Sequence, residues 1–161
     1  MPDRLLGFDI AEADIVSVGF ALGPRAKKEE RMNEPISRNN AEHYNWGGGC
    51  DGWHLLRSET VSIIEELMPP GTSEVPHYHR SSQQFFYVLA GTLSIATPSA
   101  AHLLNPSEGL AISAGTPHRV SNDGIEPTRF LLVSIPPSHG DRVAVQSIQP
   151  AGPVLTQKPQ I

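Results

Sequence analysis

The stretch that decides the fold runs from Gly71 to Gly91 and reads GTSEVPHYHRSSQQFFYVLAG. It places His77 and His79 one residue apart and continues into the apolar run of residues 85–89, which ends at a glycine turn. Residues two apart in a strand point to the same face of a sheet, so the two histidines should project together. The stretch therefore predicts a short strand that carries two neighbouring imidazoles, followed by a turn and a second strand.

Similar strand-like runs continue along the chain. Proline, glycine and other turn residues separate these runs, which cover residues 61–67, 92–97, 109–113, 119–121 and 129–135. Strands that recur about every ten residues with turn signals between them are typical of an antiparallel sandwich or barrel. No segment between the runs is long enough for the crossover helix that a parallel sheet requires. The sequence therefore predicts an all-β fold.

The composition narrows the classes of function. A length of 161 residues suits one compact domain, and a net charge of −5 gives no electrostatic footprint for a nucleic-acid partner. A single cysteine, Cys50, allows no intramolecular disulfide and gives no reason to expect an oxidising compartment. No apolar run approaches the roughly 20 residues that span a bilayer. We therefore expect a cytoplasmic protein with neither nucleic-acid nor membrane partners.

We expect three segments along the chain. Residues 1–40 form an irregular N-terminal extension, residues 41–142 form the barrel, and residues 143–161 form a tail rich in proline and glutamine. The extension mixes an apolar stretch with a charged one and has no clear period. Two interpretations of the extension stay open. It is a flanking strand or an arm that contacts a second subunit, or translation can also start at Met32 and the residues before it contribute little to the fold.

Four residues are candidates for a single metal site, namely His77, His79, Gln84 and His118. Imidazole nitrogens bind a first-row metal at about 2.0–2.1 Å, and two histidines on one strand face can reach the same ion. Two ligands alone hold a metal weakly, so the others must come from elsewhere in the fold. An H-x-H alone is more often a surface or structural pair of histidines than a metal site. The spacing of the residues around this one favours a metal site.

This spacing resembles the first motif of the cupin superfamily, G-x5-H-x-H-x3/4-E-x6-G. Gly71, His77, His79 and Gly91 match it, and Gln84 stands where the family usually has glutamate. The resemblance implies a single-domain double-stranded β-helix, the jelly-roll barrel of small cupins. It also implies one divalent transition metal (Zn, Fe, Ni or Mn) in the barrel mouth, and a homodimer.

The second cupin motif, G-x5-P-x-G-x2-H-x3-N, is matched in part. Gly115, His118 and Asn122 fall in its register, whereas Ser107 and Ser113 replace its first glycine and its proline. The resemblance covers about residues 53–142. It implies that His118 joins the two histidines of the first motif as a metal ligand.

Gln84 is the main departure from the family pattern. An amide oxygen is a weaker and neutral donor, so three histidines and a glutamine leave a divalent site with a formal charge near +2 rather than +1. Such a centre should lower the pKa of bound water more and hold enolate-like ligands more tightly. Among cupins, three-histidine dioxygenases use Fe(II), and a zinc-binding polyketide cyclase uses three histidines with a glutamine. The alternatives are a three-histidine site without Gln84, and an emptied site that binds only a ligand.

Strand parity predicts which other side chains line the cavity. The candidates, which share faces with Gln84 or His118, are Phe86, Val88, Val120 and Asn122. The outward residues Phe85 and Tyr87 would then pack against a second subunit. Glu65 and Glu66 occupy opposite faces of one strand, so one of them should point inward as a candidate base or partner of the site.

The sequence thus predicts a metal-dependent enzyme that acts on a small organic molecule, by dioxygenase-like or by cyclase- or isomerase-like chemistry. It assigns no catalytic residue. The alternative is a non-enzymatic cupin that binds a small molecule as a sensor or storage module. No basic residue recurs on the expected inward faces, which favours an uncharged, aromatic substrate over a sugar phosphate.

Overall fold

The computed structural model describes residues 33–148. Contacts divide the chain into units of residues 1–35 and 36–161, and the second unit holds all the strands described here. Most of the predicted N-terminal extension and most of the predicted tail lie outside the described residues. Within them, no helix is long and apolar enough to cross a membrane.

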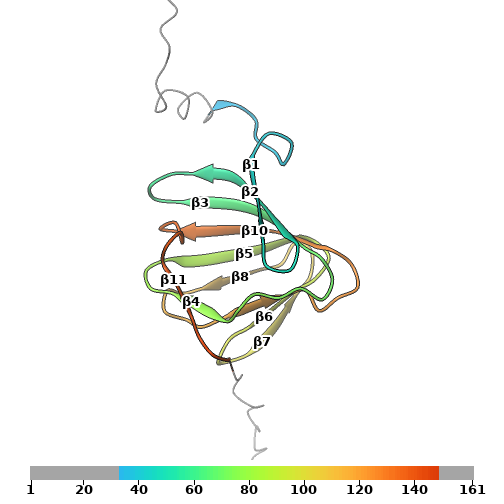
Figure 1. Cartoon of the computed structure of the whole chain (residues 1–161), viewed down its shortest axis with the longest axis vertical. Coiled ribbons are helices and arrows are strands. Elements are labelled where there is room, and N and C mark those ends of the chain that lie inside the picture. Colours follow the sequence, from blue (N-terminus) through green and yellow to red (C-terminus); the bar gives the residue numbers. More distant parts are fainter. Residues whose placement is uncertain (1–32, 149–161) are drawn as a thin grey trace, which may run out of the picture. The chain divides into compact units, whose positions relative to one another are not determined.

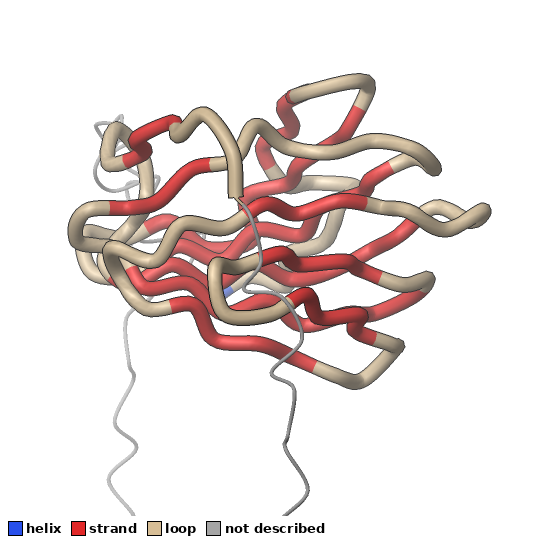
Figure 2. The backbone as a smooth tube through the Cα atoms, turned by 90° about the horizontal axis from the view of Figure 1, so that it is seen from below, coloured by secondary structure: helices blue, strands red, loops and turns tan. Residues whose placement is uncertain are grey.

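Strands make up the regular structure of this unit, and loops join them at their ends (Figure 1; Figure 2). They are β1 (Glu42–Trp46), β2 (Cys50–Arg57), β3 (Ser62–Met68), β4 (His77–His79), β5 (Gln83–Ala90), β6 (Leu93–Ala96), β7 (Ala101–Leu104), β8 (Gly109–Ile112), β9 (Arg119–Ser121), β10 (Thr128–Ile135) and β11 (Arg142–Ala144). No α-helix occurs between residues 33 and 148, and the all-β prediction is confirmed.

The strands form one large sheet and two small ones. The large sheet has the order β1-β2-β3-β10-β5-β8, and the small sheets have the orders β7-β6-β9 and β11-β4. All of the strand pairs are antiparallel. Figure 1 shows β3, β10, β5 and β8 as neighbours in the large sheet, with β4, β6 and β7 beyond it. Strand β10 therefore joins segments far apart in the sequence.

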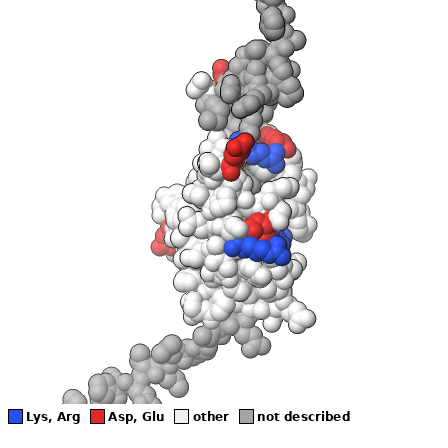
Figure 3. Space-filling view, turned by 90° about the vertical axis from the view of Figure 1, so that its left-hand side faces the viewer, with Lys and Arg blue, Asp and Glu red and all other residues white. Residues whose placement is uncertain are grey.

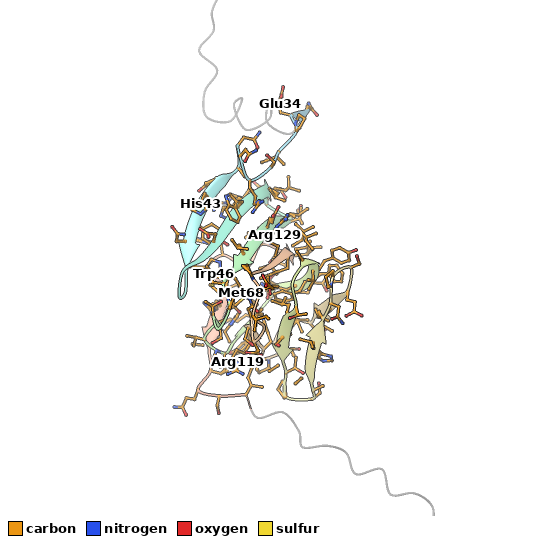
Figure 4. The ribbon with its side chains drawn as sticks, turned by 90° about the vertical axis from the view of Figure 1, so that its right-hand side faces the viewer. Glu34, His43, Trp46, Met68, Arg119 and Arg129 are labelled. Carbon is orange, nitrogen blue, oxygen red and sulfur yellow. The ribbon has the colours of Figure 1, made fainter. Side chains whose placement is uncertain are left out.

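The core lies between the large sheet and the small sheets. Its buried apolar side chains form one cluster that includes Phe86, Phe130, Leu93 and Val120, and Trp46 of β1 packs against this cluster (Figure 4). Burial of this apolar surface is the main force that holds the sheets together.

The predicted alternation along β5 is present. Gln84, Phe86 and Val88 are buried, whereas Phe85 and Leu89 are 43% and 37% exposed. The exposed pair lies on the outer face of the large sheet, where the expected second subunit would pack. The homodimer stays a prediction.

The motif positions that call for glycine have a left-handed backbone. Gly71, Gly91 and Gly115 have φ values of 75°, 73° and 79°, a region that side chains with a Cβ rarely enter. Gly91 also passes close to the backbone at Pro127, where a Cβ atom would lie 2.6 Å from the carbonyl oxygen. Ser107, which replaces the first glycine of the second motif, keeps this conformation with φ of 71°. At Ser107 the backbone conformation of the second motif is therefore preserved although the glycine is replaced.

Candidate metal centre

The two predicted histidine segments meet at β4. His77 and His79 lie at the ends of this short strand, and both are buried. His118, just before β9, exchanges two backbone hydrogen bonds with His77, at 3.0 and 2.8 Å. The amide of Gly115 donates to the carbonyl oxygen of His79 at 2.7 Å. Backbone hydrogen bonds thus hold the turn that contains Gly115 and His118 against β4.

The three imidazoles form one compact cluster. One ring nitrogen of each of His77, His79 and His118 lies within 4.8 Å of the others. The ring centroids of His77 and His118 are 4.4 Å apart. Nitrogens about 2.1 Å from a common ion would be separated by distances of this order or less, so small side-chain movements would bring all three onto one metal.

Hydrogen bonds orient two of the rings for metal binding. His77 Nδ1 donates to the carbonyl oxygen of Val75, and His118 Nδ1 donates to that of Thr116, both at 3.0 Å. A neutral imidazole protonated at Nδ1 leaves Nε2 free as a ligand, and metal-bound histidines are commonly oriented in this way. His79 Nδ1 is buried without a hydrogen-bond partner among the described residues. The donor set fits a first-row transition metal.

Gln84 faces the same cluster. Its Oε1 lies 3.1 Å from His118 Nε2, and its Nε2 donates to the Ser134 hydroxyl at 3.4 Å. Because the His118 proton is on Nδ1, His118 Nε2 and Gln84 Oε1 are both hydrogen-bond acceptors and form no hydrogen bond with each other. Two ligands about 2.1 Å from one ion and at right angles to each other are about 3 Å apart, so this contact fits a shared metal. Coordination by the Gln84 oxygen stays a prediction.

The histidines are kept neutral. Burial, and after it the neighbouring His118, lower the pKa of His77 to about 3. Burial also lowers the pKa of His79 and of His118. Metal ions compete with protons for imidazole nitrogens, so neutral rings at ordinary pH are ready to bind.

A cavity of about 510 Å³ adjoins the cluster. His77, His79 and Gln84 form part of its wall. The rest of the wall comes from β1, β2 and β3, the β3–β4 loop, β10, and the segment from Pro137 to Arg142; it includes Tyr44, Trp46, His54, Arg57, Ile64, Glu66, Glu74, Leu132, His139 and Arg142. The predicted lining residues Phe86, Val88, Val120 and Asn122 are buried in the interior and are not part of this wall.

These four residues instead fill the space between the sheets. The Phe86 ring centroid lies 6.1 Å from that of Phe130 and, in a T-shaped arrangement, 6.0 Å from that of His118. The side-chain amide of Asn122 donates to the carbonyl oxygens of Met68 and Glu126, both at 2.8 Å. These side chains are packed in the interior, so the cavity is lined by other residues.

The cavity wall is more polar than the sequence suggested. Arg57 and Arg142 both contribute to it, although no basic residue recurs on the inward strand faces from which an uncharged substrate was predicted. Arg57 pairs with Glu42 at 2.8 Å. The face shown in Figure 3 carries small groups of charges of both signs rather than an extended patch of one sign. Parity along the central strands could not reveal these residues, because Arg57 is the last residue of β2 and Arg142 the first residue of β11, outside the predicted strand runs.

Arg142 and Glu74 surround the outer side of His77. Arg142 Nη2 donates to the Val75 carbonyl oxygen at 3.0 Å and lies 3.1 Å from His77 Nδ1. A Glu74 carboxylate oxygen lies 3.7 Å from the same nitrogen. Burial raises the pKa of Glu74 to about 7, although Arg142 opposes the rise. Groups in this position orient a metal-binding histidine and tune its basicity.

The structure settles which of the adjacent glutamates points inward. Glu66 pairs with the inward-facing Phe130 of β10 and lines the cavity. Glu65 lies on the opposite face, where it forms ion pairs with Arg129 at 3.0 Å and with Arg38 at 3.3 Å.

The single cysteine, Cys50, is not part of the cavity wall or of the histidine cluster. Cys50 is 1% exposed, and burial raises the pKa of its thiol. A buried thiol of this kind is poorly reactive.

Comparison with known proteins identifies the family. The family model described as a cupin domain matches residues 64–134. An uncharacterized protein of Methanocaldococcus jannaschii is 30% identical over 89 residues, which cover 55% of this chain and 71% of that protein. Protein SchB of Streptomyces halstedii is 33% identical over 117 residues, covering 66% of this chain and 85% of SchB. The chain belongs to the cupin superfamily.

Other similar proteins have names that concern polyketides. The tetracenomycin polyketide synthase protein TcmJ of Streptomyces glaucescens is 31% identical over 65 residues, or 40% of this chain and 44% of TcmJ. This cupin thus spans less than half of that relative.

Solved structures share the fold. The polyketide cyclase RemF of Streptomyces resistomycificus superposes with a TM-score of 0.60 at 20% identity, covering 70% of this chain and 84% of RemF. A cupin-superfamily sugar phosphate isomerase of Silicibacter pomeroyi superposes with a TM-score of 0.56 at 21% identity, covering 63% and 75%. The predicted double-stranded β-helix of a small cupin is confirmed.

Proposed function

We propose that this cupin binds one divalent transition metal through His77, His79 and His118, with the Gln84 oxygen as a fourth ligand. The bound metal would serve an enzyme that converts a small carbonyl compound by cyclase- or isomerase-like chemistry. The observation that carries the proposal is the buried cluster of three neutral imidazoles beside a cavity of about 510 Å³. The names of TcmJ and RemF support carbonyl chemistry of the polyketide kind.

The residues of the chain have distinct tasks in this scheme. A divalent ion held by neutral ligands supplies a Lewis acid that stabilises negative charge on a carbonyl oxygen. The Val75 and Thr116 carbonyl oxygens hold the rings of His77 and His118 in position. The aromatic side chains of Tyr44 and Trp46 give the cavity apolar surface against which a planar substrate can pack.

The test is a metal analysis of the protein as isolated and after reconstitution, combined with turnover and oxygen-uptake measurements on diketones, thiols and phenols. The proposal expects close to one equivalent of zinc, nickel or manganese, together with rearrangement of a diketone and no oxygen uptake. Less than about a tenth of an equivalent of any metal after reconstitution would contradict it. A metal-loaded protein that binds these compounds without converting them would favour the non-enzymatic alternative.

A dioxygenase is the second candidate, because the three histidines alone would also suit Fe(II). It requires iron in the isolated protein and oxygen consumption that depends on the substrate. The metal analysis and the oxygen-uptake measurement therefore distinguish the two candidates.

Gln84→Ala is expected to lower zinc affinity about 10-fold or more, as loss of a group that tunes a metal does. Gln84→Glu should raise the affinity, because a carboxylate adds one negative charge to the ligand set. Competition with a chromogenic chelator measures both. Ser134→Ala, which removes only the hydroxyl that receives the Gln84 amide, serves as the control and should have a smaller effect. Unchanged affinity in Gln84→Ala would leave a site of three histidines.

A further inference from the structure

Glu66 is a buried carboxyl group to which the proposed metal site assigns no role. It is 5% exposed on the inward face of β3 and lines the same cavity as the histidines of β4. Its neighbour Glu65 forms ion pairs with arginines, but among residues 33–148 no ion pair within 4.0 Å reaches Glu66. Ionisation of a buried carboxyl without a paired cation costs free energy. An ion pair therefore does not explain why Glu66 is buried.

A row of three residues across β1, β2 and β3 holds this carboxyl. Tyr44 pairs with Gly52, and Gly52 pairs with Glu66. A Cβ atom at Gly52 would collide with the Tyr44 ring, so the missing side chain lets the ring lie across β2. The Tyr44 hydroxyl thereby reaches Glu66 and donates to its Oε1 at 3.0 Å. Glycine inside a strand often marks such a close approach.

Glu66 is remote from Gln84 along the strands. The row Ser62–Ser134–Gln84 crosses β3, β10 and β5, and Glu66 is four residues farther along β3 than Ser62. At about 3.3 Å per residue, that offset is about 13 Å along the strand. Both ends of this span belong to one cavity. A ligand that fills it would present one oxygen to the histidines and a second oxygen to Glu66.

We propose that the Glu66 carboxyl donates a hydrogen bond, and during the reaction a proton, to a second carbonyl oxygen of the substrate. This inference rests on the proposed function, and it narrows the substrate to molecules with carbonyl oxygens at two separated positions. In the step, a C–H bond beside that carbonyl breaks and its proton passes to cavity water. Its electron pair forms the enol double bond, and the oxygen takes the Glu66 proton. The same water then returns a proton to the carboxylate.

The surroundings of Glu66 suit a proton donor. Burial raises the pKa of Glu66 to about 8, and the Glu74 carboxyl adds to the rise. The Tyr44 hydroxyl and the Arg142 guanidinium oppose it. Among the described residues, Glu66 also interacts with the Cys50 thiol, whose pKa burial raises. The carboxyl should therefore keep its proton at neutral pH, as a carboxylic acid that donates to an oxyanion must.

The first test needs neither metal nor substrate. Carbon-13 NMR of glutamate-labelled, metal-free protein should show a carboxyl resonance that titrates near pH 8. Glu66→Gln should remove this resonance, and the matched control Glu65→Gln should leave it in place. Tyr44→Phe should shift the titration to higher pH, because it removes a hydrogen bond that stabilises the carboxylate. Titration of Glu66 in the usual range of glutamate would overturn the proposal.

The second test compares two ketones on the zinc-loaded protein. 1,4-Diacetylbenzene offers a second carbonyl oxygen, and acetophenone offers one. Near pH 6 the diketone should bind about 3- to 10-fold more tightly, the gain expected from one additional hydrogen bond. This preference should fade as the pH rises through about 8, because an ionised Glu66 has no proton to donate.

Variants separate Glu66 from the rest of the cavity. Glu66→Leu should abolish the preference, whereas Glu66→Gln, which keeps a donor, should retain it without the pH dependence. Equal binding of both ketones at every pH would overturn the role of Glu66 and leave the metal site intact. Failure of the zinc-loaded protein to bind either ketone would instead contradict the proposed function and, with it, this role of Glu66.

Discussion

Replacing His118 by alanine is expected to abolish tight zinc binding, with a loss of affinity of roughly 100-fold or more. Changes to residues that only support a metal ligand already cost about 10- to 100-fold. His118 is 1% exposed, and its Nε2 faces both the cluster and the Gln84 oxygen. Without it, the proposed site keeps two histidines from one strand and the Gln84 oxygen, a weaker donor, and holds a metal weakly. Competition with a chelator of known affinity measures the change.

The matched control is His102→Ala. His102 lies on β7 and is not part of the cavity wall, so its loss should leave zinc affinity unchanged. Circular dichroism of both metal-free variants would check that the sheets still form. If the His118 variant folds and binds zinc like the wild type, the three-histidine site is wrong.

Phe130→Ala is expected to lower the free energy of unfolding by about 3–5 kcal/mol, the usual cost of removing a buried phenylalanine side chain. Phe130 is 1% exposed on β10, and its ring packs against Phe86. It lies between Glu66 on β3 and Val88 on β5 in the pairing register, so a cavity there would weaken the centre of the large sheet. Urea denaturation of the metal-free protein measures the loss.

Ile125→Ala is the control for this prediction. Ile125 is 90% exposed, so its truncation should change the unfolding free energy by no more than about 0.5 kcal/mol. A loss below about 1 kcal/mol for Phe130→Ala would mean that the core closes over the missing ring.

Local sequence patterns predicted the parts of the site that lie within single strands. The period of two along β5 correctly placed Gln84 and Phe86 inside and Phe85 outside. The cupin resemblance implied that His118 would join the histidines of β4, and the structure places their rings together. The alternation along β5 was predictable from the residues alone, because strand parity is a property of short segments.

The cavity wall depended on pairings between distant segments. The inward face of Glu66 could not be deduced, because the turn at residues 69–71 breaks the parity between β3 and β4. Tyr44 reaches the cavity only because Gly52 lies opposite it on the neighbouring strand. The predicted strand runs begin at residue 61, so β1 and β2, which carry these two residues, were not among them.

The place of β10 has a consequence for how the protein is made. This strand begins at residue 128, yet it pairs with β3 and β5 in the middle of the large sheet. During synthesis, β3 and β5 cannot complete their pairing until β10 has been made. Until then their apolar faces and unpaired edges are exposed to other molecules. Since pairing between distant segments also slows folding, we expect nascent chains that stop before residue 128 to remain sensitive to protease. Emergence of β10, rather than of His118 ten residues before it, would then complete the metal centre.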